Sequence, residues 1–470
     1  MRDTIAAIST PLGAGGLGVI RISGPQARAV AARVFLPLGK KSVEKMTGYT
    51  CLYGHVKKND EVLDEAVCTC FASPKSYTGE DVMELSCHGG AFLLEEILQA
   101  VIEAGARGAQ PGEFTRRALE NGKLSLTQAE AVMDLIGAQG QMAARAALAA
   151  REGALFQALE PIKNQLLQLN SHLSALIDFP EEDLPELSLS VLYQNLRDVR
   201  ESLSHLLSQG KRGKILQKGI SCAIVGRPNV GKSSLMNLLA GYRRSIVTPI
   251  PGTTRDVVEE LVSLDGLVLR LMDTAGIRET QDLVELEGVS IAKQRIEEAD
   301  LVLAVFDLST PLASEDRQVL SLLERQGLTL ASETSVSHET FPAPVITIWN
   351  KSDLPCCLET EEMSRRLPGV VISAKEGKGA EALWEKIRET LRLNQLDPNA
   401  PLLANRRQEE CAARALSQLE EALSALAEGW TLDAVSVGVE EALQALMELT
   451  GEKASQETID QVFRQFCVGK

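Results

Sequence analysis

The sequence predicts a multi-domain protein that combines α/β and all-α parts, with a P-loop α/β domain inserted into a helical domain. Residues 1–122 carry short β-type runs between Gly, Pro and Asn or Asp turns. Residues 123–215 and 394–470 are rich in Ala, Leu, Gln and Glu at helical spacing, whereas residues 216–393 alternate strand and helix patterns around Gly-rich turns. We therefore expect an N-terminal α+β domain, a helical domain in two parts, and between those parts an inserted domain whose sheet is mostly parallel.

The overall composition is that of a globular protein. Hydrophobic residues make up 44% of the chain and charged residues 24%, which excludes a disordered protein. The net charge of −16 excludes a molecule that clamps nucleic acid over its whole surface, although a basic patch on one domain is compatible with it. No apolar run approaches about 18 residues, and the first residues lack a signal-peptide segment. We expect a cytoplasmic protein without a membrane span.

The nine cysteines are irregularly spaced and contain no CxxC pair, which is typical of reduced cysteines and not of a disulfide or zinc framework. Cys467 stands apart because it lies in the C-terminal run Phe466-Cys467-Val468-Gly469-Lys470. Two interpretations remain open from the residues. The thiol takes part in chemistry, or it is an apolar side chain that packs the last helix.

In the N-terminal part, strands are expected at residues 19–23, 66–71 and 82–87, followed by a helix at 91–104. Residues 13–18 match the dinucleotide fingerprint GxGxxG, but a β-branched run follows them where that fingerprint requires a helix. The pattern therefore predicts a glycine hairpin loop. The helical region after residue 124 is expected to break at Gly153, at Pro161 and at the Asp-Phe-Pro corner of residues 178–180.

The strongest motif begins directly after the buried strand run at residues 222–225. It reads Gly226-Arg227-Pro228-Asn229-Val230-Gly231-Lys232-Ser233, and a helical pattern starting at Ser234 follows. This strand–loop–helix context is what a P-loop requires, because backbone N–H groups and the helix N-terminus wrap the phosphates. Lys232 then reaches the β- and γ-phosphates, and Ser233 ligates Mg²⁺. The predicted phosphate contacts are Asn229, Val230, Gly231, Lys232, Ser233 and Ser234.

Three further motifs, in this order, are typical of a Ras-like GTP-binding domain of the translation-factor type. A strand ends in Asp273-Thr274-Ala275-Gly276, which delivers an acid toward the Mg²⁺. Another ends in Asn350-Lys351-Ser352-Asp353, where Asp353 can accept two hydrogen bonds from guanine that adenine does not offer. Ser373-Ala374-Lys375 suits a loop that contacts the base. The nucleotide is therefore expected to be GTP.

The water-orienting glutamine of Ras-type GTPases is missing, because Ile277 follows the second motif. Water positioning and charge neutralisation must come from elsewhere. Arg255 is interpreted as a solvated surface residue in preference to an arginine finger. Thr254 is the natural switch threonine for Mg²⁺. The predicted GTP contacts of this segment are Thr248, Pro249, Ile250, Pro251, Gly252, Thr253 and Thr254.

Several of these features together resemble the MnmE (TrmE) family of bacterial tRNA-modification GTPases, over essentially the whole chain: Asn229, the Gly-Thr-Thr-Arg-Asp run at 252–256, the helical flanks and the Cys-Val-Gly-Lys ending. The resemblance implies G domains that dimerise across the nucleotide, with K⁺ in place of an arginine finger. It places K⁺ at Asn229, Thr248, Ile250 and Thr253. It also selects Glu285 as the residue that orients water, although from the residues alone Glu285 is one acid among several on a helix face.

For the N-terminal domain, the resemblance implies dimerisation and binding of a tetrahydrofolate derivative, in the 5-formyl or 5,10-methylene form. A carboxylate can grip the donor–acceptor edge of a pterin, and cations can meet the glutamate carboxylates of folate. The C-terminal ending is implied to dock near this site. The residues that match are Arg21, Glu84, Lys123 and Lys470.

The function that the resemblance implies is a homodimeric, K⁺-stimulated GTPase working with an FAD-dependent partner of the GidA (MnmG) type, as a heterotetramer or a larger complex. Together they would place an aminomethyl or carboxymethylaminomethyl group on carbon five of the wobble uridine of tRNAs. Lys232, Glu285 and Cys467 are the expected catalytic residues. The alternative is a ribosome-assembly or regulatory GTPase without modification chemistry. It is disfavoured because such proteins usually append a basic RNA-binding module, and the flanks here are acidic.

Overall fold

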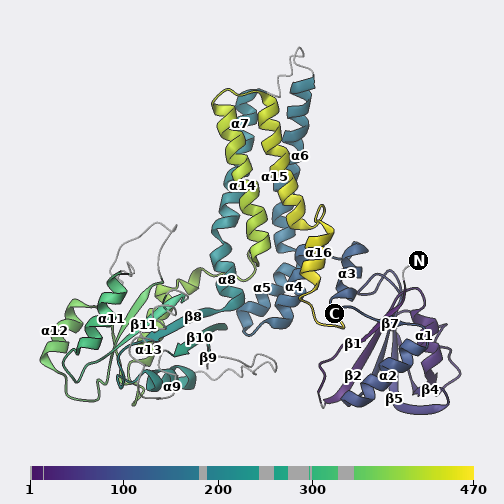
Figure 1. Cartoon of the computed structure of the whole chain (residues 1–470), viewed down its shortest axis with the longest axis horizontal. Coiled ribbons are helices and arrows are strands. Elements are labelled where there is room, and N and C mark those ends of the chain that lie inside the picture. Colours follow the sequence, from purple (N-terminus) through teal and green to yellow (C-terminus); the bar gives the residue numbers. More distant parts are fainter. Residues whose placement is uncertain are drawn as a thin grey trace, which may run out of the picture. The chain divides into compact units, whose positions relative to one another are not determined.

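The structure is a computed structural model that describes residues 3–13, 15–178, 188–242, 259–273, 296, 299–325 and 343–470. The chain forms two compact units, whose elements are labelled in Figure 1. The first comprises Met1–Met133, Ala150–Ser208 and Asn405–Lys470, and the second comprises Asp134–Ala149 and Gln209–Ala404. The domain boundaries that the sequence analysis proposes stay a prediction.

The N-terminal part of the first unit is a seven-stranded sheet in the order β3-β4-β5-β6-β2-β1-β7. Its neighbouring strands are antiparallel except for the parallel pair β1 and β7. The elements are β1 (Ile5–Ile8), β2 (Gly15–Ser23), α1 (Ala27–Val34), β3 (Phe35–Pro37), β4 (Thr50–Lys58), β5 (Glu61–Phe71), β6 (Val82–Gly89), α2 (Ala91–Glu103), β7 (Arg107–Gly108) and α3 (Glu113–Glu120).

Apolar side chains of α1 and α2 pack with those of the strands in one core, which includes the fully buried Ile20, Leu85 and Ile97. The GxGxxG segment opens no helix, as expected, but its residues 15–18 lie within strand β2, where a hairpin loop was predicted. The predicted strands at 19–23, 66–71 and 82–87 lie within β2, β5 and β6, and the predicted helix is α2.

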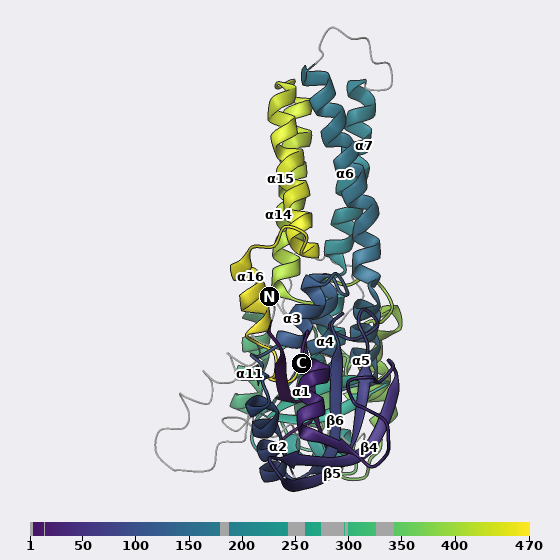
Figure 2. The same cartoon turned by 90° about the vertical axis from the view of Figure 1, so that its right-hand side faces the viewer.

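Four long helices of the first unit run side by side, with α14 against α15 and α7, and α6 against α15 and α7 (Figures 1 and 2). Apolar residues at heptad spacing, Leu159, Leu166 and Leu173, bury one face of α6. The helices of the helical region are α4 (Leu126–Gly137), α5 (Gln141–Glu152), α6 (Ala154–Asp178), α7 (Leu189–Ser208), α14 (Arg406–Ala427), α15 (Leu432–Thr450) and α16 (Gln456–Phe463).

The expected helix break at Pro161 is wrong, because Pro161 lies inside α6. A proline in a helix interior loses one backbone hydrogen bond and costs about 3 kcal/mol. Here the apolar face continues on both sides of the proline, through the buried Leu159 and Ile162. The packing of that face against the bundle offsets the lost hydrogen bond.

The second unit contains a six-stranded sheet in the order β13-β12-β11-β8-β10-β9, parallel except at the antiparallel edge strand β9. Every residue of β11 and β12 is buried, as expected for central parallel strands. The elements are α8 (Gly210–Lys218), β8 (Ile220–Val225), α9 (Lys232–Tyr242), β9 (Glu259–Leu264), β10 (Leu267–Asp273), β11 (Leu301–Asp307), α11 (Ser314–Arg325), β12 (Val345–Asn350), α12 (Leu358–Arg366), β13 (Val370–Val371), α13 (Ala380–Thr390) and η2 (Leu393–Gln395).

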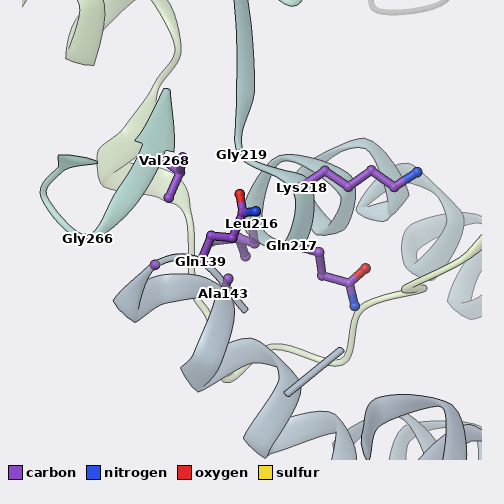
Figure 3. Close-up of a pocket in the computed structure, with 9 residues that line it drawn as sticks. Gln139, Ala143, Leu216, Gln217, Lys218, Gly219, Gly266 and Val268 are labelled. Carbon is purple, nitrogen blue, oxygen red and sulfur yellow. The ribbon is translucent and has the colours of Figure 1, made fainter. Parts of the chain in front are cut away.

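Within the second unit, the turn between β9 and β10 is held by α5 and by the end of α8. The Met142 N–H donates to the Gly266 carbonyl at 2.9 Å. Gly219, at φ +73°, passes so close to Val268 that a Cβ would lie 2.3 Å from the Val268 carbonyl oxygen. Figure 3 shows the residues around a cavity at this junction, whose volume of about 10 Å³ holds roughly one water and no nucleotide.

The carboxyl ends of the parallel strands β8, β11 and β12 lie at one edge of the sheet, where ligands of open α/β sheets bind. The predicted fold class is confirmed: an α+β N-terminal domain, a helical domain, and an α/β domain with a mostly parallel sheet inserted in the helical region. Among the described helices, none combines the length and the apolar character that crossing a membrane requires.

Candidate nucleotide site and C-terminal tail

The P-loop connects the end of β8 to the start of α9 through residues that need unusual backbone angles. Gly226 has φ +155°, and a Cβ there would lie 2.4 Å from the Val305 carbonyl oxygen. Asn229 has φ +62°, a left-handed conformation that asparagine tolerates better than most residues. The buried Lys232 ammonium donates to the carbonyl oxygens of Gly226 at 2.8 Å and Arg227 at 2.9 Å. The loop thus curls around its lysine, as phosphate binding requires.

Ser233 and Ser234 stand in the first turn of α9 with exposed side chains. The first N–H groups of a helix have no partner within the helix, and the helix dipole adds positive potential there. Together with Lys232, this turn forms a site for an anion such as a phosphate. The exposed Ser233 hydroxyl lies in the same turn, where it is predicted to ligate Mg²⁺.

Asn350, at the end of β12, joins the P-loop to the loop of residues 373–375. Its Nδ2 donates to the Val230 carbonyl at 2.8 Å, and its Oδ1 accepts from the Ala374 N–H at 2.9 Å. The approach is close, since a Cβ on Gly231 would lie 2.3 Å from Asn350 Nδ2. One buried amide therefore sets the spacing between the phosphate-binding loop and the predicted base-binding loop.

Asp353 lies beside this amide, and its Oδ1 accepts a hydrogen bond from the Ser373 hydroxyl at 2.6 Å. That hydrogen bond lowers the pKa of Asp353, so its half-buried carboxylate stays ionised at neutral pH. An ionised carboxylate only accepts hydrogen bonds, which suits the N–H and amino group of guanine. The structure brings Asn350, Asp353, Ser373 and Ala374 together, with the exposed Lys375 next in the chain.

In the N-terminal domain, Arg21 and Glu84 face each other across β2 and β6, with Nε and Oε1 2.8 Å apart. The Arg21 guanidinium lies 5.6 Å from the ring centres of both Tyr77 and Phe114, within cation–π range. Arg21 and Glu84 are each about one-fifth exposed. The result is a charged pair that remains accessible beside two aromatic rings.

The C-terminal tail is anchored on the segment that contains Phe114. The Phe114 N–H donates to the Lys470 carbonyl at 3.2 Å, and the Gly112 N–H donates to the Cys467 carbonyl at 3.3 Å. Gly469 has φ +96°, and a Cβ there would lie 2.2 Å from the Ile8 carbonyl oxygen. The tail therefore requires glycine at position 469 to reach this position.

The Cys467 side chain is exposed. The apolar contacts of this segment come instead from Phe463 and Phe466, which are buried with ring centres 5.0 Å apart. The interpretation of Cys467 as a cysteine that packs the last helix is therefore wrong. Its thiol faces solvent on a segment whose backbone is tied to Gly112.

Comparison with known proteins identifies the family. A model described as the MnmE helical domain matches residues 126–467, and one described as the N-terminus of the GTP-binding protein TrmE matches residues 4–123. The tRNA modification GTPase MnmE of Acetivibrio thermocellus is 39% identical over 100% of this chain and 99% of its own length, and that of Heliobacterium modesticaldum is 41% identical over the same shares. The chain belongs to the MnmE family of tRNA modification GTPases. Among solved structures, Aquifex aeolicus Era bound to GDP and AlF₄⁻ is 27% identical over 44% of this chain and 66% of that one, with a TM-score of 0.27 that adds nothing to the assignment.

Membership of the MnmE family confirms the predicted resemblance, the GTPase activity and the link to tRNA modification. The relatives found are tRNA modification GTPases, so they support the predicted function and not the alternative of a ribosome-assembly GTPase. A GTPase of this kind implies GTP as the substrate. The residue roles that the resemblance suggested are not decided by family membership, and they stay predictions.

Many of the predicted MnmE site residues lie outside the described part of the chain. Asp273 is described only by its backbone, as the last residue of β10 in register with Ile224. No cluster of three or more metal-ligating side chains occurs among the described residues. The predicted residues outside the described part are Thr248, Pro249, Ile250, Pro251, Gly252, Thr253, Thr254, Arg255, Thr274, Ala275, Gly276, Ile277 and Glu285.

Sequence reasoning missed the two aromatic rings beside Arg21, because an aromatic residue in a single sequence indicates core packing first. Phe114 is fully buried, and the Tyr77 hydroxyl shares a hydrogen bond with Thr115 at 2.8 Å. Lys123 reaches the loop between β5 and β6 that carries Tyr77, where its Nζ donates to the Pro74 carbonyl at 3.1 Å. The sequence did offer one signal for Tyr77, because it lies close in the chain to the predicted folate residue Glu84.

Proposed function

We propose that this MnmE-family protein is a cytoplasmic homodimer that hydrolyses GTP and, with an FAD-dependent partner of the GidA (MnmG) type, modifies carbon five of the wobble uridine of tRNAs. The group added is aminomethyl or carboxymethylaminomethyl, with nitrogen from ammonium or glycine. The observation that carries the proposal is that the C-terminal tail lies close to the Arg21–Glu84 ion pair. The Phe114 ring lies within cation–π range of Arg21, and the Phe114 N–H donates a hydrogen bond to Lys470.

A tetrahydrofolate derivative fits the chemistry of the Arg21 site. The Glu84 carboxylate supplies acceptors for the N–H edge of a pterin, and the partly exposed Arg21 guanidinium supplies a cationic group beside the two rings. Lys123 and Lys470 are cations available for the carboxylates of the folate tail. When bound, the folate would supply the one-carbon unit, in its 5,10-methylene form. Cys467, which is exposed on the C-terminal tail that also carries Lys470, would act as the nucleophile.

The experiment that tests the proposal is nucleoside analysis of tRNA from cells that lack this protein. We expect the carbon-five modification of wobble uridine to disappear and to return when the wild-type chain is supplied. Arg21→Ala should fail to restore it, because Glu84 loses its partner and the pterin loses its cationic surface. Arg33→Ala, an exposed arginine on α1, is the matched control and should restore it. Unchanged wobble nucleosides in the deleted cells would contradict the proposal.

The proposal includes activation of GTP hydrolysis by K⁺ and by dimerisation of the G domains. Asn229 supports it by position, because its exposed amide stands in the left-handed part of the P-loop next to the phosphate site. An amide oxygen suits a hard monovalent cation, and that cation would neutralise charge that develops on the phosphates. Thr248, Ile250 and Thr253 would complete the K⁺ site. Ser233 and Thr254 would hold Mg²⁺, and Glu285 would orient the water.

Hydrolysis is expected to be at least about tenfold faster in KCl than in NaCl at equal ionic strength, since one fixed charge beside the phosphoryl group is worth several kcal/mol. Asn229→Gly should remove most of that difference. Glycine is the suitable replacement because it accepts φ +62° without strain, whereas alanine does not. GTP affinity measured in parallel is the control and should change little. Equal rates in the two salts would rule out the K⁺ site.

A further inference from the structure

Asp307, the last residue of β11, is a buried acid that none of the GTP-binding motifs includes. It is 5% exposed. Its Oδ1 accepts from the N–H of Ser309 at 2.9 Å and from the Ser309 hydroxyl at 2.7 Å, and its Oδ2 accepts from the Lys351 ammonium at 2.7 Å. Both oxygens of this carboxylate are therefore committed, and one of them holds a lysine of the predicted base site.

The backbone around Lys351 explains how the two residues meet. Asp307 and Asn350 are opposite each other on the parallel strands β11 and β12, and the Leu308 N–H donates to the Asn350 carbonyl at 2.9 Å. Lys351 then takes φ +66°, a left-handed conformation that is unusual for a lysine. It lies in the chain between Asn350, which sets the loop spacing, and Asp353, the predicted contact to the base. With its ammonium fixed at Asp307, its methylene stem spans the distance from the predicted base loop to the end of β11.

A second cation reaches the same acid from the phosphate-binding loop. Arg227 Nη2 lies 3.9 Å from Asp307 Oδ2, and it donates to the Thr310 hydroxyl at 2.6 Å. Arg227 Nε lies 2.9 Å from Asp316. Burial alone would raise the pKa of Asp307, but the hydrogen bonds from Lys351 and Ser309 outweigh it and keep the pKa below its ordinary value. The acid stays charged between one cation of the phosphate loop and one of the base loop.

We propose that Asp307 is a positioning residue for the nucleotide: it fixes the ammonium of Lys351 so that the lysine stem covers one face of the guanine base. This inference rests on the proposed assignment of Lys351 to the nucleotide site. An apolar stem with a fixed charged end suits the flat face of a base, because the methylene groups contact the ring while the charge stays paired. Without the acid, the ammonium turns to solvent and the stem leaves the base.

The test is a double-mutant cycle in the full-length protein, measured as the dissociation constant of a fluorescent GDP analogue. Asp307→Asn and Lys351→Met are each expected to weaken binding about tenfold, the size expected when one charge-assisted hydrogen bond is lost. The double variant should bind no more weakly than Lys351→Met alone, because the acid acts through the lysine. Asp316→Asn is the matched control. It touches Arg227 and not Lys351, so its effect should add to that of Lys351→Met.

A merely structural role for Asp307 predicts the opposite pattern. Losses that add in the double variant, or an unchanged affinity in Asp307→Asn, would overturn the proposal. If Asp307→Asn does not fold, Ser309→Ala serves in its place, since it removes one of the two bonds to Oδ1 and keeps the charge. Faster GDP dissociation in Ser309→Ala, abolished in the Lys351→Met background, supports the proposal, and unchanged dissociation overturns it. These results concern nucleotide affinity alone, so they are separate from the outcome for tRNA modification.

Discussion

Replacing Cys467 with serine is expected to abolish wobble-uridine modification and to leave GTP hydrolysis and the melting temperature close to wild type. The side chain is exposed, and the contacts of this segment with the body of the domain come from its backbone and from Phe463 and Phe466. An exposed substitution of this kind changes stability by no more than about 0.5 kcal/mol. Serine keeps the shape of the side chain but is a much weaker nucleophile than a thiol at neutral pH.

Two neighbouring positions make the Cys467 experiment specific. Val468→Ala is the matched control, because Val468 is 53% exposed and its loss should leave modification intact. Gly469→Ala should also stop modification although it keeps the thiol, since its Cβ would clash with the Ile8 carbonyl and release the tail. The measurements are tRNA nucleoside analysis, GTP turnover and thermal unfolding. A Cys467→Ser protein that melts early, and whose folded fraction still modifies tRNA, would show that the thiol serves stability only.

The parts of the molecule that sequence reasoning predicted are those in which local spacing carries the chemistry. The loop from Gly226 to Ser233 must follow a strand and precede a helix, so the motif predicts its own surroundings. The helical pattern on both sides of residues 216–393 likewise predicted the insertion. Pro161 shows the limit of such reasoning, because tertiary packing of an apolar face outweighs a local helix-breaking signal.

Residues that act across strands were out of reach of sequence reasoning. Asp307 lies 44 positions from Lys351, and only the pairing of β11 with β12 brings the two side chains together. Phe114 meets Arg21 and the C-terminal tail in the same way, through three segments far apart in the chain. An acid at a strand end or a buried phenylalanine has no motif of its own. Its role follows from its neighbours, and the neighbours follow from the fold.

Asp353→Asn is expected to weaken GTP binding by roughly a hundredfold or more and to shift the preference of the protein toward xanthosine triphosphate. A site built to accept hydrogen bonds rejects a ligand that it leaves unpaired by large factors. In the wild type, we expect the ionised carboxylate to accept from both the ring N–H and the amino group of guanine. The asparagine amide keeps one acceptor but turns an N–H toward the amino group of guanine, which is itself a donor. Xanthine has a carbonyl at that position, so the same N–H becomes a hydrogen-bond donor to it.

Asp353→Asn should keep the hydrogen bonds that hold the two loops in place, so a change in binding can be assigned to the lost contact with the base. Ser373 can still donate to the asparagine oxygen, and Asn350 still links Val230 to Ala374. The measurement is competition of GTP, XTP and ATP against a fluorescent nucleotide, with thermal unfolding as the check on folding. Glu376→Gln is the matched control, because it removes a carboxylate charge that pairs with Lys378 and keeps the backbone hydrogen bond to Ser373, and it should keep the preference for GTP. If Asp353→Asn binds GTP as tightly as the wild type and gains nothing for XTP, then Asp353 does not read the base.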